Sequence, residues 1–299
     1  MRFSNGLQNV RKRLGLTLVE LLIASTISII AIGVSITIYA SAKENYSVAA
    51  NKNVSNITQL NIKKIILKAI RTAGLSCGHG FTITNYIDRT GDIISSNSFL
   101  LDGSSVRIGN VSFLGALSGQ SENYQANTDY IMVKTQTYES LLSQDIANTT
   151  IYADSIDGVT GGDYIAVCND SGVNLVKAKT INIDSNQIEI EQTPSNYFGA
   201  GDYIGKFQVH TYYIGSTDNI EGGDPIYALY LNVNDGVVSE SYKLFDRVSD
   251  LEVYYATVNE QEVNWTHIDS DIDIEQLGSP AIQVRFKVDM KEYKKTILL

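Results

Sequence analysis

The stretch whose residue types come closest to a metal site is an acidic run near the C terminus. Its carboxylates alternate as D-x-D-x-D-x-E, at Asp269, Asp271, Asp273 and Glu275. Calcium prefers such oxygen ligands, but an EF-hand loop also needs Gly at its sixth position and Glu at its twelfth. Ile274 and Pro280 stand at those two positions. We therefore interpret the run as a solvated acidic loop, with a calcium site of another shape as the alternative.

Residues for catalysis are sparse and scattered. The three histidines, His79, His210 and His267, stand far apart, and the sequence contains no G-x-S-x-G, H-E-x-x-H, P-loop or dinucleotide-binding motif. Cys77 and His79 would make half of a zinc site, but no second pair follows at a metal-binding spacing. The sequence thus predicts a protein that is not an enzyme and that holds no cofactor.

The chain contains only two cysteines, Cys77 and Cys168. In an oxidising compartment they would form a disulfide that closes a loop of roughly 90 residues, worth about 4 to 5 kcal/mol in the chain-entropy model. The alternative is a pair of separate buried thiols. The choice between these alternatives depends on where the domain resides.

An uncharged run near the N terminus indicates a membrane. No charged residue occurs from Leu21 to Ala42, and at about 1.5 Å per helical residue this run covers a hydrocarbon core of roughly 30 Å. Arg11, Lys12 and Arg13 precede it, which places the N terminus in the cytoplasm and the rest of the chain across the membrane. A secretory signal peptide would have a shorter run and a small-residue cleavage site after it.

Glu20 is the one carboxylate at the mouth of this run. A carboxylate in a spanning segment is costly and normally needs a partner, and the nearest helical neighbours of Glu20 are apolar. Two interpretations remain open from the residues alone. Glu20 either pairs with a cation that a neighbouring subunit supplies, or it lies in the first turn near the headgroups, where the helix dipole favours an anion.

The helix is expected to continue past the membrane, because no proline occurs between residues 16 and 73. Apolar residues at mostly helical spacing are predicted to pack on the following domain: Val54, Ile57, Ile62, Ile65, Ile66, Ala69, Ile70 and Ala73. Lys63, Lys64, Lys68 and Arg71 form the other face, and Gly74 fits a helix stop.

Alternation of apolar and polar residues predicts antiparallel strands in the rest of the chain. The stretches are Ile131–Thr135, Tyr164–Cys168, Ile188–Glu191, Ile204–Ile214, Ile226–Val233, Val237–Phe245, Leu251–Tyr255 and Ala281–Met290. The clearest alternation is the last, with Met290 as the final residue of its apolar face. Tyr138–Thr149 is the only later stretch with helical character.

The charge of the chain limits its partners. The formal net charge is −10, and residues 1–15 carry four cations, Arg2, Arg11, Lys12 and Arg13, and no acid, so removing them would leave −14. Such a charge argues against a broad surface for nucleic acid or anionic lipid. We therefore predict no nucleic-acid partner.

The N terminus resembles the class III signal of type IV prepilins and type II secretion pseudopilins, which joins a basic leader, Gly15, the sequence L-T-L-V-E and an apolar run. The resemblance implies cleavage by a prepilin peptidase between Gly15 and Leu16 and N-methylation of Leu16, although most members of the family have Phe at this position. Glu20 would then be the fifth residue of the mature chain. The cation that Glu20 meets would be the α-amino group of a neighbouring subunit.

Later segments are similar to PilW-type minor pilins. They include A-I-R-T-A-G-L-S-C at 69–77, G-G-D-Y-I-A-V-C-N-D at 161–170 and four strand-like pieces at 207–214, 226–231, 248–255 and 281–288. Ser76 departs from the second Gly that is usual before the cysteine. The resemblance covers most of the chain.

The resemblance implies an α+β, type IV pilin-like fold, with a long N-terminal membrane-spanning helix packed on a large antiparallel β-rich domain. The expected segments are a leader peptide at 1–15, the transmembrane part of the helix at 16–42, its amphipathic continuation at 43–73 and the exported domain at 74–299. The implied location is the inner membrane, with the C-terminal domain in the periplasm, and then the extracellular pilus.

The function that the resemblance implies is that of a minor pilin, which joins other minor pilins and the major pilin to prime assembly of a type IV pilus and can stay at its tip. Such pili serve twitching motility, adhesion or DNA uptake. One alternative is a minor pseudopilin of type II secretion. A membrane-anchored enzyme or sensor is another, but it would need a retained leader and a catalytic constellation.

Overall fold

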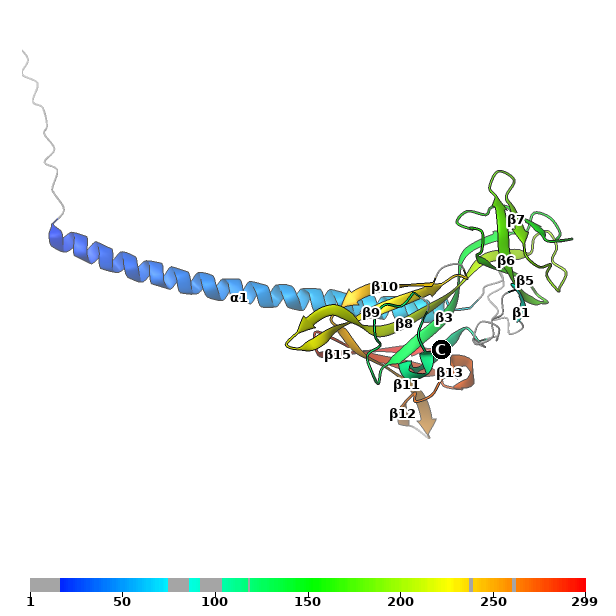
Figure 1. Ribbon diagram of the computed structural model, residues 1–299. Coiled ribbons are helices and arrows are strands. Elements are labelled where there is room, and N and C mark those ends of the chain that lie inside the picture. The colour runs from blue at the N-terminus through cyan, green and yellow to red at the C-terminus, as the bar shows by residue number, and fades with distance from the viewer. Residues whose placement is uncertain (1–16, 75–85, 92–103, 118, 237–238, 260–261) are drawn as a thin grey trace, which may run out of the picture. The chain divides into compact units, whose positions relative to one another are not determined.

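The computed structural model describes residues 17–74, 86–91, 104–117, 119–236, 239–259 and 262–299 (Figure 1). The chain divides into two compact units, Met1–Asn56 and Ile57–Leu299. The first consists, in its described part, of most of one long helix. The second contains the last turns of that helix and all the described strands.

Helix α1 runs from Leu18 to Arg71 and is rich in apolar residues through its first half. Lys68 and Arg71 lie in its last turn, where cations offset the negative end of the helix dipole. Gly74 follows with φ of +105°, a conformation that disfavours residues with a Cβ. Its backbone N–H donates to the carbonyl of Lys134 at 3.0 Å, which ties the end of the helix to the sheet.

Eleven described strands form a mainly antiparallel sheet in the second unit. Its main path follows the order β13 (Ile272–Asp273), β2 (Val106–Asn110), β3 (Asp129–Leu141), β8 (Tyr203–Glu221), β5 (Tyr164–Asn169), β6 (Gly172–Asn182), β7 (Gln187–Ile190) and β4 (Thr150–Tyr152). Off this path, β9 (Asp224–Asn234) pairs with β8, β10 (Ser239–Asp246) pairs with β9, and β1 (Tyr86–Arg89) pairs with β6 in parallel.

A second, four-stranded antiparallel sheet has the order β12 (Glu262–His267), β11 (Val248–Asn259), β14 (Ala281–Val288) and β15 (Lys291–Leu298). Two short helical turns complete the described elements: α3 (Val111–Leu114) and a 3₁₀ turn at Ile274–Gln276. The predicted α+β, pilin-like architecture, a long apolar helix followed by large antiparallel sheets, is confirmed.

The end of α1 is part of a core that also contains both sheets. Ile62, Ile66 and Ile70, spaced four residues apart, are buried there. They share the cluster with Ile131 and Val133 of β3 and with a row from β14, Ile282, Val284 and Phe286. Val54 and Ile57, which we predicted on the same buried face, are 62% and 59% exposed. That part of the prediction is wrong, because burial of the helix begins only near Ile62.

Two other predictions from the sequence are wrong. The stretch with helical character, Tyr138–Thr149, begins with the end of β3, because pairing of Tyr138–Leu141 with β8 overrides its helical tendency. Met290 is almost fully exposed instead of completing the apolar face of β14. It has a φ of +64° in the two-residue turn between β14 and β15, so the alternation stops at Val288.

A second apolar core lies among strands β4 to β7 and the beginning of β8. It contains Ile151, Ile165, Val176, Ile188 and Phe198, all nearly inaccessible to solvent. Figure 1 shows these strands grouped apart from β11 to β15. The second unit thus supports its sheets with separate apolar clusters.

Candidate assembly surface

Glu20 forms a capping box at the start of α1. The backbone N–H and the hydroxyl of Thr17 donate to Glu20 Oε2 at 2.9 and 3.0 Å, and the backbone N–H of Glu20 donates to Thr17 Oγ1 at 3.3 Å. This reciprocal arrangement satisfies donors that a helix start leaves open. Our statement that the near neighbours of Glu20 are apolar is therefore wrong with respect to Thr17. The spacing T-x-x-E was the signal for this contact.

The capping box leaves part of the carboxylate open. Both bonds from Thr17 end on Oε2, and Oε1 accepts no hydrogen bond from the described residues. The two interpretations of Glu20 are therefore compatible: Glu20 lies in the first turn of the helix, and its Oε1 can still contact another molecule. Gly15 and Leu16, the predicted cleavage and methylation site, lie outside the described residues, so their roles stay predictions.

Helix α1 exposes a long apolar surface, and among the described residues it is the one helix long and apolar enough to cross a membrane. Within the uncharged run the exposed large apolar residues are Leu21, Leu22, Ile23, Ile27, Ile29, Ile30, Ile32, Val34, Ile36, Ile38 and Tyr39. Exposure of this kind continues past Ala42, at Tyr46, Val48, Val54, Ile57 and Leu60. We call this second set the upper apolar residues.

The upper apolar residues extend beyond what a membrane anchor needs. About 20 apolar residues span a bilayer, and the uncharged run already supplies them. Monomeric proteins seldom expose large continuous apolar surfaces unless something else covers them. More than half of each side chain stays exposed at Val54, Ile57 and Leu60 in the part of the chain that the structure describes.

The predicted disulfide partners differ in what the structure describes. Cys168 lies in β5 and is fully buried, beside Ala166 and Val173 in an apolar cluster. Cys77 lies outside the described residues. The disulfide between them stays a prediction.

The acidic run near the C terminus is held partly by protein partners. Asp273 is buried and accepts two hydrogen bonds from the Arg107 guanidinium, at 2.7 and 3.1 Å. Glu275 accepts from the backbone N–H and hydroxyl of Ser105. Asp269 and Asp271 are exposed. Our interpretation of the whole run as a solvated loop is thus wrong at Asp273, which lies in strand β13.

No group of three or more His, Cys, Asp or Glu side chains is placed to hold a metal ion in the part of the chain that the structure describes. The carboxylates of Asp273 and Glu275 are instead engaged by an arginine and a serine. The arrangement of this run can therefore stabilise the edge of the large sheet, where β13 pairs with β2.

The two described histidines lie in different surroundings, and His79 lies outside the described residues. His267 Nε2 is 3.0 Å from Oδ2 of the buried Asp129, which also accepts the backbone N–H of Val253 at 2.7 Å. Burial raises the pKa of the Asp129 carboxyl, against the lowering effect of those two donors. A catalytic dyad would need a nucleophile on the other ring nitrogen, and no such contact occurs among the described residues. The pair joins β3 to β11 and β12.

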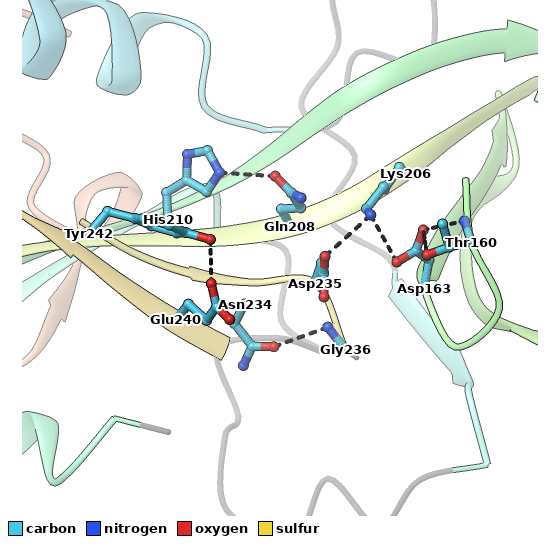
Figure 2. Close-up of polar contacts among 10 residues, drawn as sticks. All are labelled: Thr160, Asp163, Lys206, Gln208, His210, Asn234, Asp235, Gly236, Glu240 and Tyr242. Carbon is cyan, nitrogen blue, oxygen red and sulfur yellow. Dashed lines mark hydrogen bonds and ion pairs between the residues drawn. The ribbon is translucent and has the colours of Figure 1, made fainter. Parts of the chain in front are cut away.

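Figure 2 shows a second polar group, centred on Lys206 of β8. Lys206 Nζ lies 2.8 Å from Asp163 Oδ1 and 3.2 Å from Asp235 Oδ2, and its side chain and that of Asp163 are largely buried. Asp163 Oδ2 also accepts the backbone N–H and the hydroxyl of Thr160. Burial lowers the pKa of Lys206, but the two carboxylates outweigh it and raise the pKa overall. Sequence patterns did not reveal this group, since its members are far apart in the chain.

His210 lies further along the same face of β8, and its Nε2 is 3.1 Å from Gln208 Oε1, an amide oxygen that accepts the hydrogen bond when Nε2 carries the proton (Figure 2). Burial lowers the pKa of its imidazole. His210 lines a groove of about 870 Å³ beside the last turn of α1, together with Val133, Tyr212 and Leu231.

Comparison with known proteins identifies no relative. No protein-family model matches the sequence, and neither the curated proteins nor the solved structures yield a match.

Proposed function

We propose that this chain is a minor pilin of a type IV pilus, of the PilW type, and that it works by assembly rather than by catalysis. Three features support the proposal: the prepilin-like sequence around Gly15, the α+β pilin-like architecture, and a helix start that leaves Glu20 Oε1 open. In the proposal the chain joins other minor pilins and the major pilin through α1. Together they prime filament assembly, and this subunit can stay at the tip.

The observation that carries the proposal is the extent of the exposed apolar surface on α1. The uncharged run alone would anchor a protein in a bilayer. The upper apolar residues would then face water unless another protein covers them, and burying a Val, Leu or Ile side chain gains about 1.5 to 3 kcal/mol. In a filament, helices of neighbouring subunits pack side by side and would cover both the uncharged run and the upper apolar residues.

In this proposal a prepilin peptidase cleaves the chain between Gly15 and Leu16 on the cytoplasmic side, and Leu16 becomes the methylated N terminus. Thr17 stays in the mature chain, so the capping box of Glu20 survives the cleavage. Glu20 Oε1 then receives the α-amino group of a neighbouring subunit. The pair is strong because the site is poorly solvated.

The proposed location follows from the proposed role as a minor pilin. The chain starts in the inner membrane with its C-terminal domain in the periplasm, where oxidation would join Cys77 to Cys168, and it ends in the extracellular pilus. A minor pseudopilin of type II secretion would share the N-terminal features. The two differ in the filament that each helps to build.

The first experiment compares a strain that lacks this gene with its parent, by shearing surface filaments and by analysing secreted proteins. Loss of pili with normal secretion is the expected result. Normal pili with lost secretion would assign the chain to the pseudopilins. Normal pili and normal secretion, or a mature protein that still begins at Met1 in a strain with active peptidase, would exclude both filament functions.

The second experiment tests Glu20 directly with Glu20→Leu. We expect normal cleavage, shown by intact mass, and reduced incorporation into sheared filaments. Glu44→Leu is the matched control, because Glu44 is an exposed carboxylate further along the same helix. Incorporation of Glu20→Leu at the level of the control would refute the docking role.

A further inference from the structure

Lysines gather on one edge of the second unit, in a chain with an excess of acids. Lys63 of α1 and Lys291 of β15 each place Nζ 5.4 Å from the centre of the Tyr293 ring. Lys295 lies on the same face of β15, two residues further along, and is close enough to Lys63 to affect its titration. We call Lys63, Lys291, Lys295 and the Tyr293 ring the lysine cluster.

The lysine cluster has no anionic partner among the described residues. None of its three amines forms an ion pair there, whereas Lys179, Lys206, Lys243 and Lys287 all do. The nearest acid in the strand, Glu292, points to the opposite face, since its partner in the register is Lys287 rather than Val288 or Phe286. Burial, with the neighbouring charge of Lys295, lowers the pKa of Lys63. The Tyr293 ring attracts the amines of Lys63 and Lys291, but no carboxylate among the described residues neutralises their charges.

The position of the lysine cluster joins it to the proposed helix contacts. Lys63 lies one turn after the exposed Leu60 on α1, so a molecule that covers Leu60 also reaches the cluster. The Tyr293 ring is half-buried and stacks on Phe286, with ring centres 6.1 Å apart, which offers a fixed apolar platform between the amines. This combination of a platform and a cationic rim suits a protein surface.

We propose that the lysine cluster docks a carboxylate-rich surface of a neighbouring filament subunit. The inference rests on the proposed function and names the chemistry of one contact within it. Charge complementarity supports a carboxylate partner for these unpaired amines, and the proposed function places a neighbouring subunit against Leu60 of α1, one turn before Lys63. Nucleic acid would need a much wider basic surface than three lysines in a chain of net charge −10.

Lysines also protect exposed edge strands against sheet-to-sheet aggregation, and β15 is an edge strand among the described residues. That role explains Lys291 and Lys295 but leaves the helix residue Lys63 without a reason. A docking surface explains all three, because Lys63 and Lys291 meet at the Tyr293 ring and Lys295 lies near Lys63. The test therefore has to separate docking from edge protection.

The first measurement is carbodiimide cross-linking of the unmodified full chain in its own membranes and in sheared filaments. The reagent joins an amine to a carboxylate in direct contact. We expect intermolecular links from Lys63, Lys291 or Lys295 to carboxylates of a filament subunit. Links at equal frequency from Lys52, Lys64 and Lys294, which are exposed lysines outside the cluster, would overturn the inference.

The second measurement compares two triple variants of equal charge change. Lys63→Glu with Lys291→Glu and Lys295→Glu should lower incorporation into sheared filaments by roughly tenfold or more, because like charges then face each other across the contact. Lys52→Glu with Lys64→Glu and Lys294→Glu should incorporate as the parent does. The corresponding Gln variants show whether an effect depends on charge, should the Glu variant fail to fold.

The outcomes distinguish the two proposals. If the cluster variant incorporates normally while Glu20→Leu does not, the inference fails and the proposed function stands. If the parent chain itself is absent from filaments, the proposed function fails as well. Self-association of the cluster variant with unchanged incorporation would assign the lysines to edge protection. Selective loss of binding to phosphatidylglycerol vesicles, without loss of incorporation, would assign them to lipid and also overturn the inference.

Discussion

Two regions of this molecule differ in which side chains they expose and which they bury. Helix α1 leaves large apolar side chains exposed from Leu18 to Leu60, whereas the β-rich unit takes charges such as Asp129, Asp163 and Lys206 inside and supplies partners for them. The β-rich unit is therefore complete by itself in these respects. The helix is complete only when a membrane or another protein covers it. Substitutions in the two regions should accordingly have effects of different size in the isolated chain.

The largest effect should come from Lys206→Met in the β-rich unit. Removing the cation leaves the carboxylates of Asp163 and Asp235 without their counter-charge in a largely buried site, and breaking a buried pair costs about 3 to 5 kcal/mol. Lys243→Met is the control, because Lys243 and Asp246 form an exposed pair worth about 0 to 1 kcal/mol. Urea unfolding of the full chain in detergent, followed by the fluorescence of the single tryptophan, Trp265, measures both. Equal losses would contradict our account of the site.

A second pair of substitutions tests the boundary within α1 itself. Ile66→Ala removes a side chain that is 1% exposed, so we expect a loss of about 2 to 5 kcal/mol. Ile57→Ala removes the same atoms where they are exposed and should change stability by less than about 0.5 kcal/mol. In filaments the difference between the effects of Ile66→Ala and Ile57→Ala should become smaller, because Ile57 is proposed to contact a neighbouring subunit there. A large loss for Ile57→Ala in the isolated chain would mean that the helix is covered by its own domain.

The stability of the β-rich unit should depend on pH, because this unit contains the buried Asp129. Burial raises its pKa to about 6, so the folded chain holds this proton more tightly than the unfolded chain does. The stabilisation that the protonated Asp129 gives is fully present below about pH 4, the ordinary pKa of an aspartate carboxyl. It is lost as the pH rises through about 6, the pKa of Asp129 in the folded chain. The stability of Asp129→Asn relative to the parent should therefore rise by about 1 to 3 kcal/mol between pH 4 and pH 7.

Asp145→Asn is the matched control for this titration. The backbone N–H of Ala200 and the hydroxyl of Tyr197 lower the pKa of the exposed Asp145, so its removal should act in the opposite direction. Unfolding at several pH values between 4 and 7 measures both variants. A flat difference for Asp129→Asn would show that its carboxylate keeps an ordinary pKa in the folded chain.

The sequence predicted the architecture because the relevant signals are local. The uncharged run, the absence of proline and the alternation of Ala281–Val288 each depend on neighbouring residues, and each corresponds to an observed element. The extent of burial was not predictable in this way. Val54 and Ile57 have the same helical spacing as Ile62 and Ile66, and only the placement of the sheets decides which of them are covered.

The candidate site was only partly predictable for the same reason. Glu20 was evident from its isolation, and the T-x-x-E spacing could have revealed its capping box. The pairs Lys206 with Asp163, His267 with Asp129 and Lys63 with Tyr293 join residues that only the strand order brings together. No periodicity encodes such contacts.

The smallest expected effect concerns the start of the exposed helix. Thr17→Ala removes the hydroxyl that accepts the N–H of Glu20 and donates to its carboxylate. The loss of an N-cap threonine costs about 1 kcal/mol, or roughly a fivefold rise in local opening. Hydrogen exchange of the first-turn amides in detergent should show it, with the β-rich unit unchanged. Thr37→Ala is the control, because Thr37 bonds only the carbonyl of Gly33 inside the helix. If both variants exchanged alike, the capping box would not hold Glu20, and its Oε1 would have no fixed direction in which to meet a neighbouring subunit.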